Sequence, residues 1–161
     1  MAKMISLVGR SNVGKTTHLE KVLREIKSRG YKVATIKHDV HGFDIDVPGK
    51  DTWKHAQAGA DTVVISSPNK IAIIEKLSEE KTLDEIAEKL QNVDIIITEG
   101  YKRANKPKIE IVRMERGTEP LCDAKELLAL VTDCDIDMDV PKFSFEDVSA
   151  LVDLIEKKFI R

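Results

Sequence analysis

Hydrophobic residues recur along this chain first with the period of a strand and then with that of a helix. Residues 4–8 form an apolar run typical of a short buried strand, which ends at Gly9. Over residues 16–29 the apolar positions fall three and four apart, as on one face of a helix, and Gly30 is a natural stop. Residues 31–37 alternate and are rich in β-branched side chains, which predicts a second strand.

The same two periods continue to the end of the chain. Further helices are expected at residues 53–60, at 82–90 behind the capping box TLDE, and after a capping Ser144. Further strands are expected at residues 62–66, 71–74, 93–98, 109–112 and 128–131. The strand at 93–98 (VDIIIT) is so apolar that both its faces should be covered, as in a parallel sheet between helices.

The sequence GRSNVGKTT joins the first strand to the first helix and matches the phosphate-binding pattern GxxxxGK[ST]. In such a loop successive backbone N–H groups surround an anion, and the helix N-terminus adds partial positive charge. We expect Lys15 to reach the β- and γ-phosphates and the Thr16 hydroxyl to ligate Mg²⁺. The expected nucleotide-binding residues are Gly9, Arg10, Ser11, Asn12, Val13, Gly14, Lys15, Thr16 and Thr17.

Two residues of this loop are unusual. Asn12 stands where glycine is common, but asparagine tolerates left-handed backbone angles better than most residues. Arg10 has two interpretations. It could reach a nucleotide across a dimer, as an arginine finger does, or it could be an exposed charge that contacts phosphate at most.

A strand, a glycine loop and a helix, followed by further alternation, predict an α/β fold of three layers. We expect a P-loop NTPase fold with a mostly parallel sheet, helices on both faces, and an antiparallel hairpin (residues 62–74) at the sheet edge. With 161 residues and no linker or repeat, residues 1–161 are expected to form a single nucleotide-binding domain.

Composition narrows the possible partners. The net charge of −2 gives no basic field for nucleic acid, and no apolar run suits a signal peptide or a membrane span. Cys122 and Cys134 lack metal-binding spacing and are expected to be reduced thiols. Together these features predict a cytoplasmic protein that contacts neither nucleic acid nor membrane.

A magnesium site needs a carboxylate in addition to the Thr16 hydroxyl. In this fold class it is expected at the carboxyl end of a neighbouring strand. Glu99 directly follows the strand at 93–98, and Asp39 follows the strand at 31–37, so both are candidate ligands. The loop at residues 38–51 is rich in histidine and aspartate. Its HxxH spacing is weak evidence for a transition metal, and its oxygen ligands suit Mg²⁺ better.

Asp133 and a group of four basic residues each have two possible roles. Asp133 follows the strand at 128–131 and could accept hydrogen bonds from a guanine base, or it could cap a turn. Lys102, Arg103, Lys106 and Lys108 could attract an anionic pterin phosphate or an acidic partner, or they could be solvated surface charges.

Several motifs together resemble one known family. GRSNVGKTT, KHDVHGFDIDVPGKDTWKHAQAGAD, the SPN turn, TEGYK and PKIEIVR occur in the order found in the molybdopterin-guanine dinucleotide biosynthesis protein B (MobB) family. The resemblance covers residues 4–113 and is looser beyond. It implies a homodimer that binds GTP and Mg²⁺ and hydrolyses GTP weakly, with residues 9–17 at the phosphates and Glu99 as the acid at the metal. We take Lys15, Glu99 and Arg10 as the candidate catalytic residues. A MobA-type molybdopterin guanylyltransferase and a molybdenum insertase are the partners that it implies.

Two other functions remain open on the residues alone. The first is a small-molecule kinase that uses ATP or GTP, in which Arg103, Arg113 and Arg116 could belong to a lid. The second is a binding module that delivers GTP or molybdopterin without turnover. Since no general base is evident, a GTPase built on this site should be slow without a partner.

Overall fold

The computed structural model describes residues 3–161, which divide into two compact units. The first unit comprises residues 3–38 and 83–161, and the second comprises Asp39–Thr82. The expectation of a single domain over residues 1–161 stays a prediction. Within residues 3–161, none of the helices combines the length and the hydrophobicity that a membrane crossing requires.

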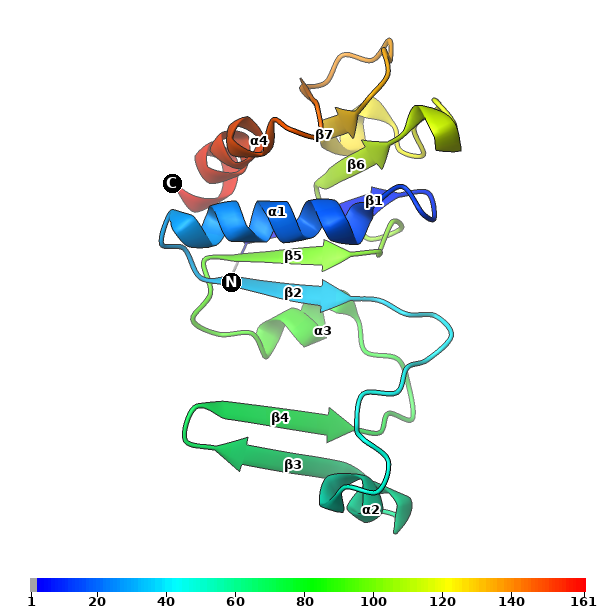
Figure 1. Ribbon diagram of the computed structural model, residues 1–161, viewed down its shortest axis with the longest axis vertical. Coiled ribbons are helices and arrows are strands. Elements are labelled where there is room, and N and C mark those ends of the chain that lie inside the picture. The colour runs from blue at the N-terminus through cyan, green and yellow to red at the C-terminus, as the bar shows by residue number, and fades with distance from the viewer. Residues whose placement is uncertain (1–2) are drawn as a thin grey trace. The chain divides into compact units, whose positions relative to one another are not determined.

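The first unit contains the phosphate loop, and its elements follow the predicted alternation closely (Figure 1). The hydrophobic periods account for this order, because each strand is an apolar run and each long helix has one apolar face. Its strands are β1 (Lys3–Gly9), β2 (Val33–Lys37), β5 (Ile95–Glu99), β6 (Lys108–Val112), β7 (Leu127–Thr132) and β8 (Lys142–Phe143). Its helices are α1 (Lys15–Ser28), α3 (Leu83–Glu88) and α4 (Val148–Ile155), with 3₁₀ turns at Met114–Arg116 and Ala124–Glu126 and a π-helical end at Glu156–Ile160.

These strands form one six-stranded sheet in the order β2-β5-β1-β6-β7-β8. Neighbouring strands of this sheet run parallel. In register, Glu99 lies beside Leu7 on one side and Lys37 on the other. Parallel strands end at the same edge of a sheet. The loop after β1, Glu99 of β5 and the residues after β6 and β7 therefore meet at one edge, where open α/β sheets bind their ligands.

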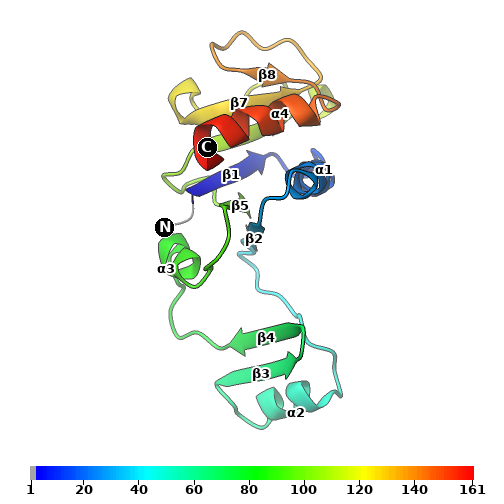
Figure 2. The ribbon, with the colours of Figure 1, turned by 90° about the vertical axis from the view of Figure 1, so that its left-hand side faces the viewer.

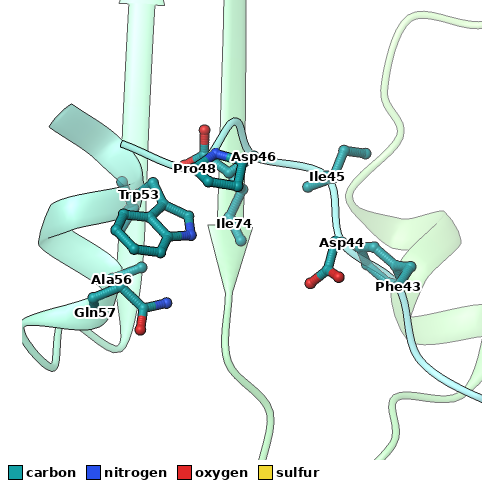
Figure 3. A pocket seen from close by; sticks show the side chains of 10 residues that line it. Phe43, Asp44, Ile45, Asp46, Pro48, Trp53, Ala56, Gln57 and Ile74 are labelled. Carbon is teal, nitrogen blue, oxygen red and sulfur yellow. The ribbon is translucent and has the colours of Figure 1, made fainter. Parts of the chain in front are cut away.

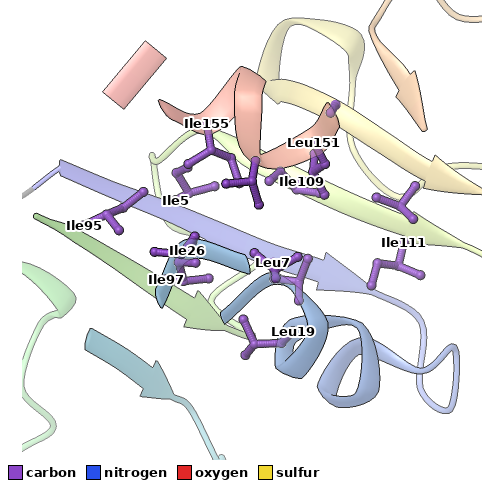
Figure 4. Close-up of a cluster of buried hydrophobic side chains, with 14 of the residues drawn as sticks. Ile5, Leu7, Leu19, Ile26, Ile95, Ile97, Ile109, Ile111, Leu151 and Ile155 are labelled. Atoms are coloured by element: carbon purple, nitrogen blue, oxygen red, sulfur yellow. The ribbon is translucent and has the colours of Figure 1, made fainter. Parts of the chain in front are cut away.

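Helices cover both faces of this sheet, which confirms the predicted three layers (Figure 2). On one face α1 and α4 pack against the strands through a buried cluster that includes Leu7, Ile26 and Ile155 (Figure 4). On the other face α3 packs through Leu83 and Ala87 in a cluster with Met4, Ile36 and Ile96. The period of two along β1 explains this division, because neighbouring residues of a strand point to opposite faces.

The second unit is small. It consists of α2 (Asp51–Gln57) and the antiparallel strands β3 (Thr62–Ser67) and β4 (Lys70–Glu75). The predicted hairpin is confirmed, but its expected place at the sheet edge is wrong, because β3 and β4 form a two-stranded sheet of their own. The hairpin has its own local packing partner: Val63 is buried, and its strand β3 contacts α2.

A cavity of about 320 Å³ lies on the helix-bearing side of this hairpin (Figure 3). Trp53 of α2, Ile74 of β4 and the loop residues Phe43, Asp46 and Pro48 contribute to its walls. Asp46 Oδ1 accepts hydrogen bonds from the Val47 amide at 2.8 Å and from the Thr52 hydroxyl at 3.2 Å. These bonds fix the loop against the start of α2.

The last helix begins later than the sequence predicts. Its N-terminal boundary is Asp147 rather than Ser144. The Asp147 carboxylate accepts a hydrogen bond from the Ser144 backbone amide at 2.9 Å, and the Ser144 hydroxyl accepts one from the Glu146 amide at 3.3 Å. Ser144 therefore closes a turn before the helix. The short strand β8 was not predicted, because two residues are too few to show a period.

Candidate nucleotide-binding site

The phosphate loop (residues 9–17) lies between the end of β1 and the first turn of α1, as its motif predicts. Gly14 precedes the helix in a left-handed conformation with φ of 86°. Asn12 is also left-handed, with φ of 60°, in keeping with the tolerance expected of asparagine. The two left-handed residues curl the loop in front of the α1 N-terminus, whose backbone N–H groups can bind an anion.

Gly9 begins the loop at a point of close backbone approach. Its φ is 154°, and it pairs in register with Ile111 of β6. A Cβ atom placed on Gly9 would lie 2.7 Å from the Ile111 carbonyl oxygen and 3.1 Å from a methyl carbon of Val13. The first position of the motif therefore needs glycine for steric reasons in this fold.

Lys15 lies across the mouth of the loop. Its ammonium donates hydrogen bonds to the carbonyl oxygens of Gly9 at 3.0 Å and Arg10 at 2.8 Å. These two bonds place a positive charge against the backbone that would surround a phosphate. An anion in the loop would find this charge already in position.

The Lys15 ammonium has an unusual electrostatic environment. Burial lowers its pKa, Glu99 opposes that effect, and the positive charges of Lys102 and Lys37 add to it. Three lysines and one glutamate therefore share this edge of the sheet. A polyphosphate that binds here would relieve the repulsion among the cations.

Thr16 and Glu99 are in direct contact. The Thr16 hydroxyl donates a hydrogen bond to Glu99 Oε1 at 2.8 Å. Two of the expected magnesium ligands, 83 positions apart in sequence, are thus neighbours. A hydroxyl and a carboxylate are both hard oxygen ligands of the kind that Mg²⁺ takes beside a triphosphate. The side chains present at this site therefore fit a magnesium ion.

Asp39, the third expected magnesium ligand, begins the second unit. Its Oδ1 atom accepts a hydrogen bond from the His41 amide at 2.9 Å, which closes a local turn. Its role as a metal ligand stays a prediction. Within residues 3–161, no three or more histidine, cysteine, aspartate or glutamate side chains gather into a metal-binding group.

The Arg10 side chain contacts a distant segment of its own chain. Its Nη2 donates a hydrogen bond to the Glu119 carbonyl oxygen at 3.3 Å, and its side chain lies beside Gly117. The arginine thus rests on the segment that connects β6 to β7. Its proposed reach to the nucleotide of a second subunit stays a prediction.

Asp133, the expected base-reading residue, lies just after β7 at the same edge of the sheet. Its Oδ1 accepts a hydrogen bond from the Met114 amide at 2.8 Å, and its Oδ2 lies 4.0 Å from the guanidinium of Arg113. Asp133 therefore caps the turn that begins at Met114, as the second interpretation expected. Its contact with a guanine base stays a prediction.

Arg113 is the main site residue whose position the sequence did not predict. The kinase interpretation placed it in a lid, but its Nε donates a hydrogen bond to the Val13 carbonyl oxygen of the phosphate loop at 2.8 Å. Its guanidinium carbon lies 4.0 Å from the centre of the Phe145 ring. The one feature of the sequence that could have indicated this contact is the position of Arg113 directly after β6, the strand that borders β1.

The four cations of the segment after Glu99 do not act as one cluster. Lys106 binds Asp84 at 2.7 Å, and the buried Lys108 binds Glu126 at 2.8 Å. Both ammonium groups are thus neutralised within the protein. The prediction of a four-residue anion site is therefore wrong for these two lysines, and only Lys102 and Arg103 remain as exposed cations of that segment.

Comparison with known proteins gives a consistent result. Residues 4–133 match the family model described as molybdopterin guanine dinucleotide synthesis protein B, MobB. The chain is 31% identical over 156 residues to the molybdopterin-guanine dinucleotide biosynthesis adapter protein of Haemophilus influenzae, covering 95% of this chain and 87% of that protein. It is 30% identical over 161 residues to the adapter protein of Escherichia coli, covering 96% and 92% of the two chains.

Solved structures of proteins from the same family have a similar fold. The chain superimposes with a TM-score of 0.74 on a crystal structure of molybdopterin-guanine biosynthesis protein B, at 32% identity and with 96% of this chain and 98% of that one covered. A crystal structure of Bacillus subtilis MobB shares the fold, with a TM-score of 0.75 at 23% identity.

Proposed function

This chain belongs to the molybdopterin guanine dinucleotide synthesis protein B family, and on that premise we propose that it is a GTP-binding adapter in molybdenum cofactor biosynthesis. It would bind GTP with Mg²⁺ and assist the attachment of GMP to molybdopterin. The observation that carries the proposal is the contact of Thr16 with Glu99 at 2.8 Å, directly beside the phosphate loop. It joins the motif's hydroxyl to a carboxylate, and these two side chains would hold a metal that accompanies a triphosphate.

Each residue at this edge has a role in the proposal. Backbone N–H groups of the loop would bind the phosphates, and Lys15 would exchange its carbonyl partners for the β- and γ-phosphate oxygens. Thr16 and Glu99 would hold Mg²⁺, which neutralises charge on the phosphates. Glu99 is occupied by this task, so it is not free to activate water, and hydrolysis by the isolated protein should be slow.

The adapter role is tested by reconstitution. We expect the wild-type protein to increase the rate at which a MobA-type guanylyltransferase converts GTP and molybdopterin into molybdopterin guanine dinucleotide. The Lys15→Ala variant should give no such increase, because the effect depends on bound nucleotide. An unchanged rate with the wild-type protein would count against the adapter role. A molybdenum insertase is the second partner to add to this assay.

A homodimer is the form in which we propose that the protein acts. The second unit exposes many large apolar side chains, and three of them, Val64, Ile71 and Ile73, lie on the hairpin face opposite the buried Val63. Their exposed fractions are 53%, 61% and 63%. A contiguous apolar face of this kind is typical of a protein–protein interface, and it supports pairing through the hairpin.

Placing a charge on this face should separate the subunits. We expect Ile73→Glu to convert a wild-type dimer into a monomer, as measured by light scattering at micromolar concentration, because an unpaired carboxylate would be buried in the interface. The control Lys158→Glu places a glutamate at an exposed position of the first unit, with an even larger change of net charge, and should leave the dimer intact. A monomeric wild-type protein, or a dimeric Ile73→Glu variant, would contradict pairing through this face.

A further inference from the structure

Arg113 connects the phosphate loop to three other parts of the first unit. It follows β6, donates a hydrogen bond to Val13 of the loop at 2.8 Å, lies over the Phe145 ring at 4.0 Å and has Asp133 at 4.0 Å. We propose that Arg113 is a positioning residue that fixes the phosphate loop in its nucleotide-binding shape. This inference rests on the proposed binding of GTP.

The geometry of one peptide group explains how this works. In a trans peptide the carbonyl group and the following N–H group point in opposite directions. The peptides of residues 3–161 are all trans, so the bond from Arg113 to the Val13 carbonyl also sets the direction of the Gly14 N–H. That N–H points away from the guanidinium. It is one of the loop donors that would bind a phosphate.

Without Arg113 this peptide group could turn over. Gly14 is left-handed and Asn12, one residue before Val13, is also left-handed, so the peptide has flexible or unusual backbone on both sides. A turned peptide would aim the Val13 carbonyl oxygen at the anion and repel it. The cost of losing the bond would thus appear in nucleotide affinity more than in stability.

The surroundings of Arg113 suit arginine in particular. Its guanidinium is planar and lies against the Phe145 ring, and its positive charge is balanced in part by Asp133. A Cβ placed on Gly14 would lie 3.5 Å from its Nη2 atom, which is ordinary van der Waals contact. The side chain therefore packs directly beneath the loop, with Phe145 packed in turn against the buried His18 of α1.

The base of the nucleotide plays no part in this contact. Loss of Arg113 should therefore weaken the binding of every nucleotide that places phosphates in the loop, and by a similar factor. A residue that reads the base would instead change the ratio of GTPγS to ATPγS affinity. This difference separates a positioning role at the phosphates from a role in base selection.

The test compares Arg113→Met and Arg113→Lys with the wild-type protein by calorimetric titration of GTPγS and ATPγS with Mg²⁺. Methionine keeps an unbranched apolar side chain but removes the donor and the charge, so the dissociation constants should rise roughly tenfold with an unchanged ratio between nucleotides. Lysine can still donate to the Val13 carbonyl and should recover part of the affinity. Lys125→Ala removes an exposed cation of the segment between β6 and β7 and serves as the control.

Each result has a definite meaning, with the melting temperature of each variant as the measure of folding. Wild-type affinity in a folded Arg113→Met variant would overturn the role of Arg113 while leaving GTP binding intact. If Arg113→Met does not fold, Arg113→Lys decides, because weaker binding at an unchanged melting temperature supports the inference and unchanged affinity overturns it. Failure of the wild-type protein to bind either nucleotide would overturn the GTP proposal and this inference with it.

Discussion

Replacing Lys15 with alanine is expected to weaken the binding of GTP with Mg²⁺ roughly 100-fold, the effect of losing a charge-assisted contact in a partly buried site. The ammonium donates to the Gly9 and Arg10 carbonyl oxygens at 3.0 and 2.8 Å, so it is already in position at the mouth of the loop. Fold stability should change little, because the two carbonyl groups that it leaves can bind water. Calorimetric titration of both proteins with GTPγS measures the difference.

Lys102→Ala is the matched control for Lys15→Ala. The Lys102 charge also acts on this site, since it helps to lower the pKa of Lys15. Its side chain is exposed, so its contribution is screened by solvent and salt. We expect a small decrease in affinity that fades as salt is added. Equal decreases for the two variants would mean that general charge, and not a placed ammonium, governs binding.

Replacing Gly9 with alanine is expected to destabilise the protein by about 2–4 kcal/mol, from overpacking together with backbone strain. The added Cβ would lie 2.7 Å from the backbone oxygen of Ile111, an atom of a central strand that cannot move without disturbing the sheet. The φ of 154° at Gly9 adds strain for any other residue. Nucleotide affinity should fall as well, because the loop starts at this residue. Urea denaturation and calorimetry measure the two effects separately.

Gly30→Ala provides the control for Gly9→Ala. Gly30 follows α1 with φ of 87°, and a Cβ there would meet no atom within 4 Å. Its replacement should therefore cost only the backbone strain, about 1 kcal/mol, without any change in nucleotide binding. If Gly9→Ala were no more destabilising than Gly30→Ala, the close approach of β1 and β6 would not be the reason for glycine in the motif.

The parts of the site that the sequence predicted are those set by local pattern or by strand order. The phosphate loop is continuous in sequence, and its motif specifies the turn, the lysine and the hydroxyl. The contact of Thr16 with Glu99 could be expected because parallel strands end at one edge of a sheet, and β1 and β5 are neighbours. Both inferences require only the strands and their direction.

The contact of Arg113 with Val13 could not be predicted in this way. The two residues are 100 positions apart, and nothing in the sequence around Arg113 shows which carbonyl it contacts. Phe145 is further still along the chain, in the third where the resemblance to the family was loose. The exact side-chain partner depends on packing that only the folded chain specifies.

The charged residues show the same limit. Lys106 and Lys108 looked like surface cations of a glycine-opened loop, but Asp84 and Glu126 neutralise them from other elements. Likewise, the hairpin could be recognised from its short turn, whereas nothing in its sequence shows that β3 and β4 form a sheet of their own. Charge and periodicity describe single segments, and these features arise between segments.

The central claim is that this phosphate loop binds GTP together with Mg²⁺. It is tested most directly by calorimetric titration of GTPγS and ATPγS into the wild-type protein, with Mg²⁺ present and absent. We expect saturable binding of GTPγS that is tighter than that of ATPγS and is weakened when Mg²⁺ is removed. Tighter binding of ATPγS, or GTPγS affinity that is the same without Mg²⁺, would contradict it.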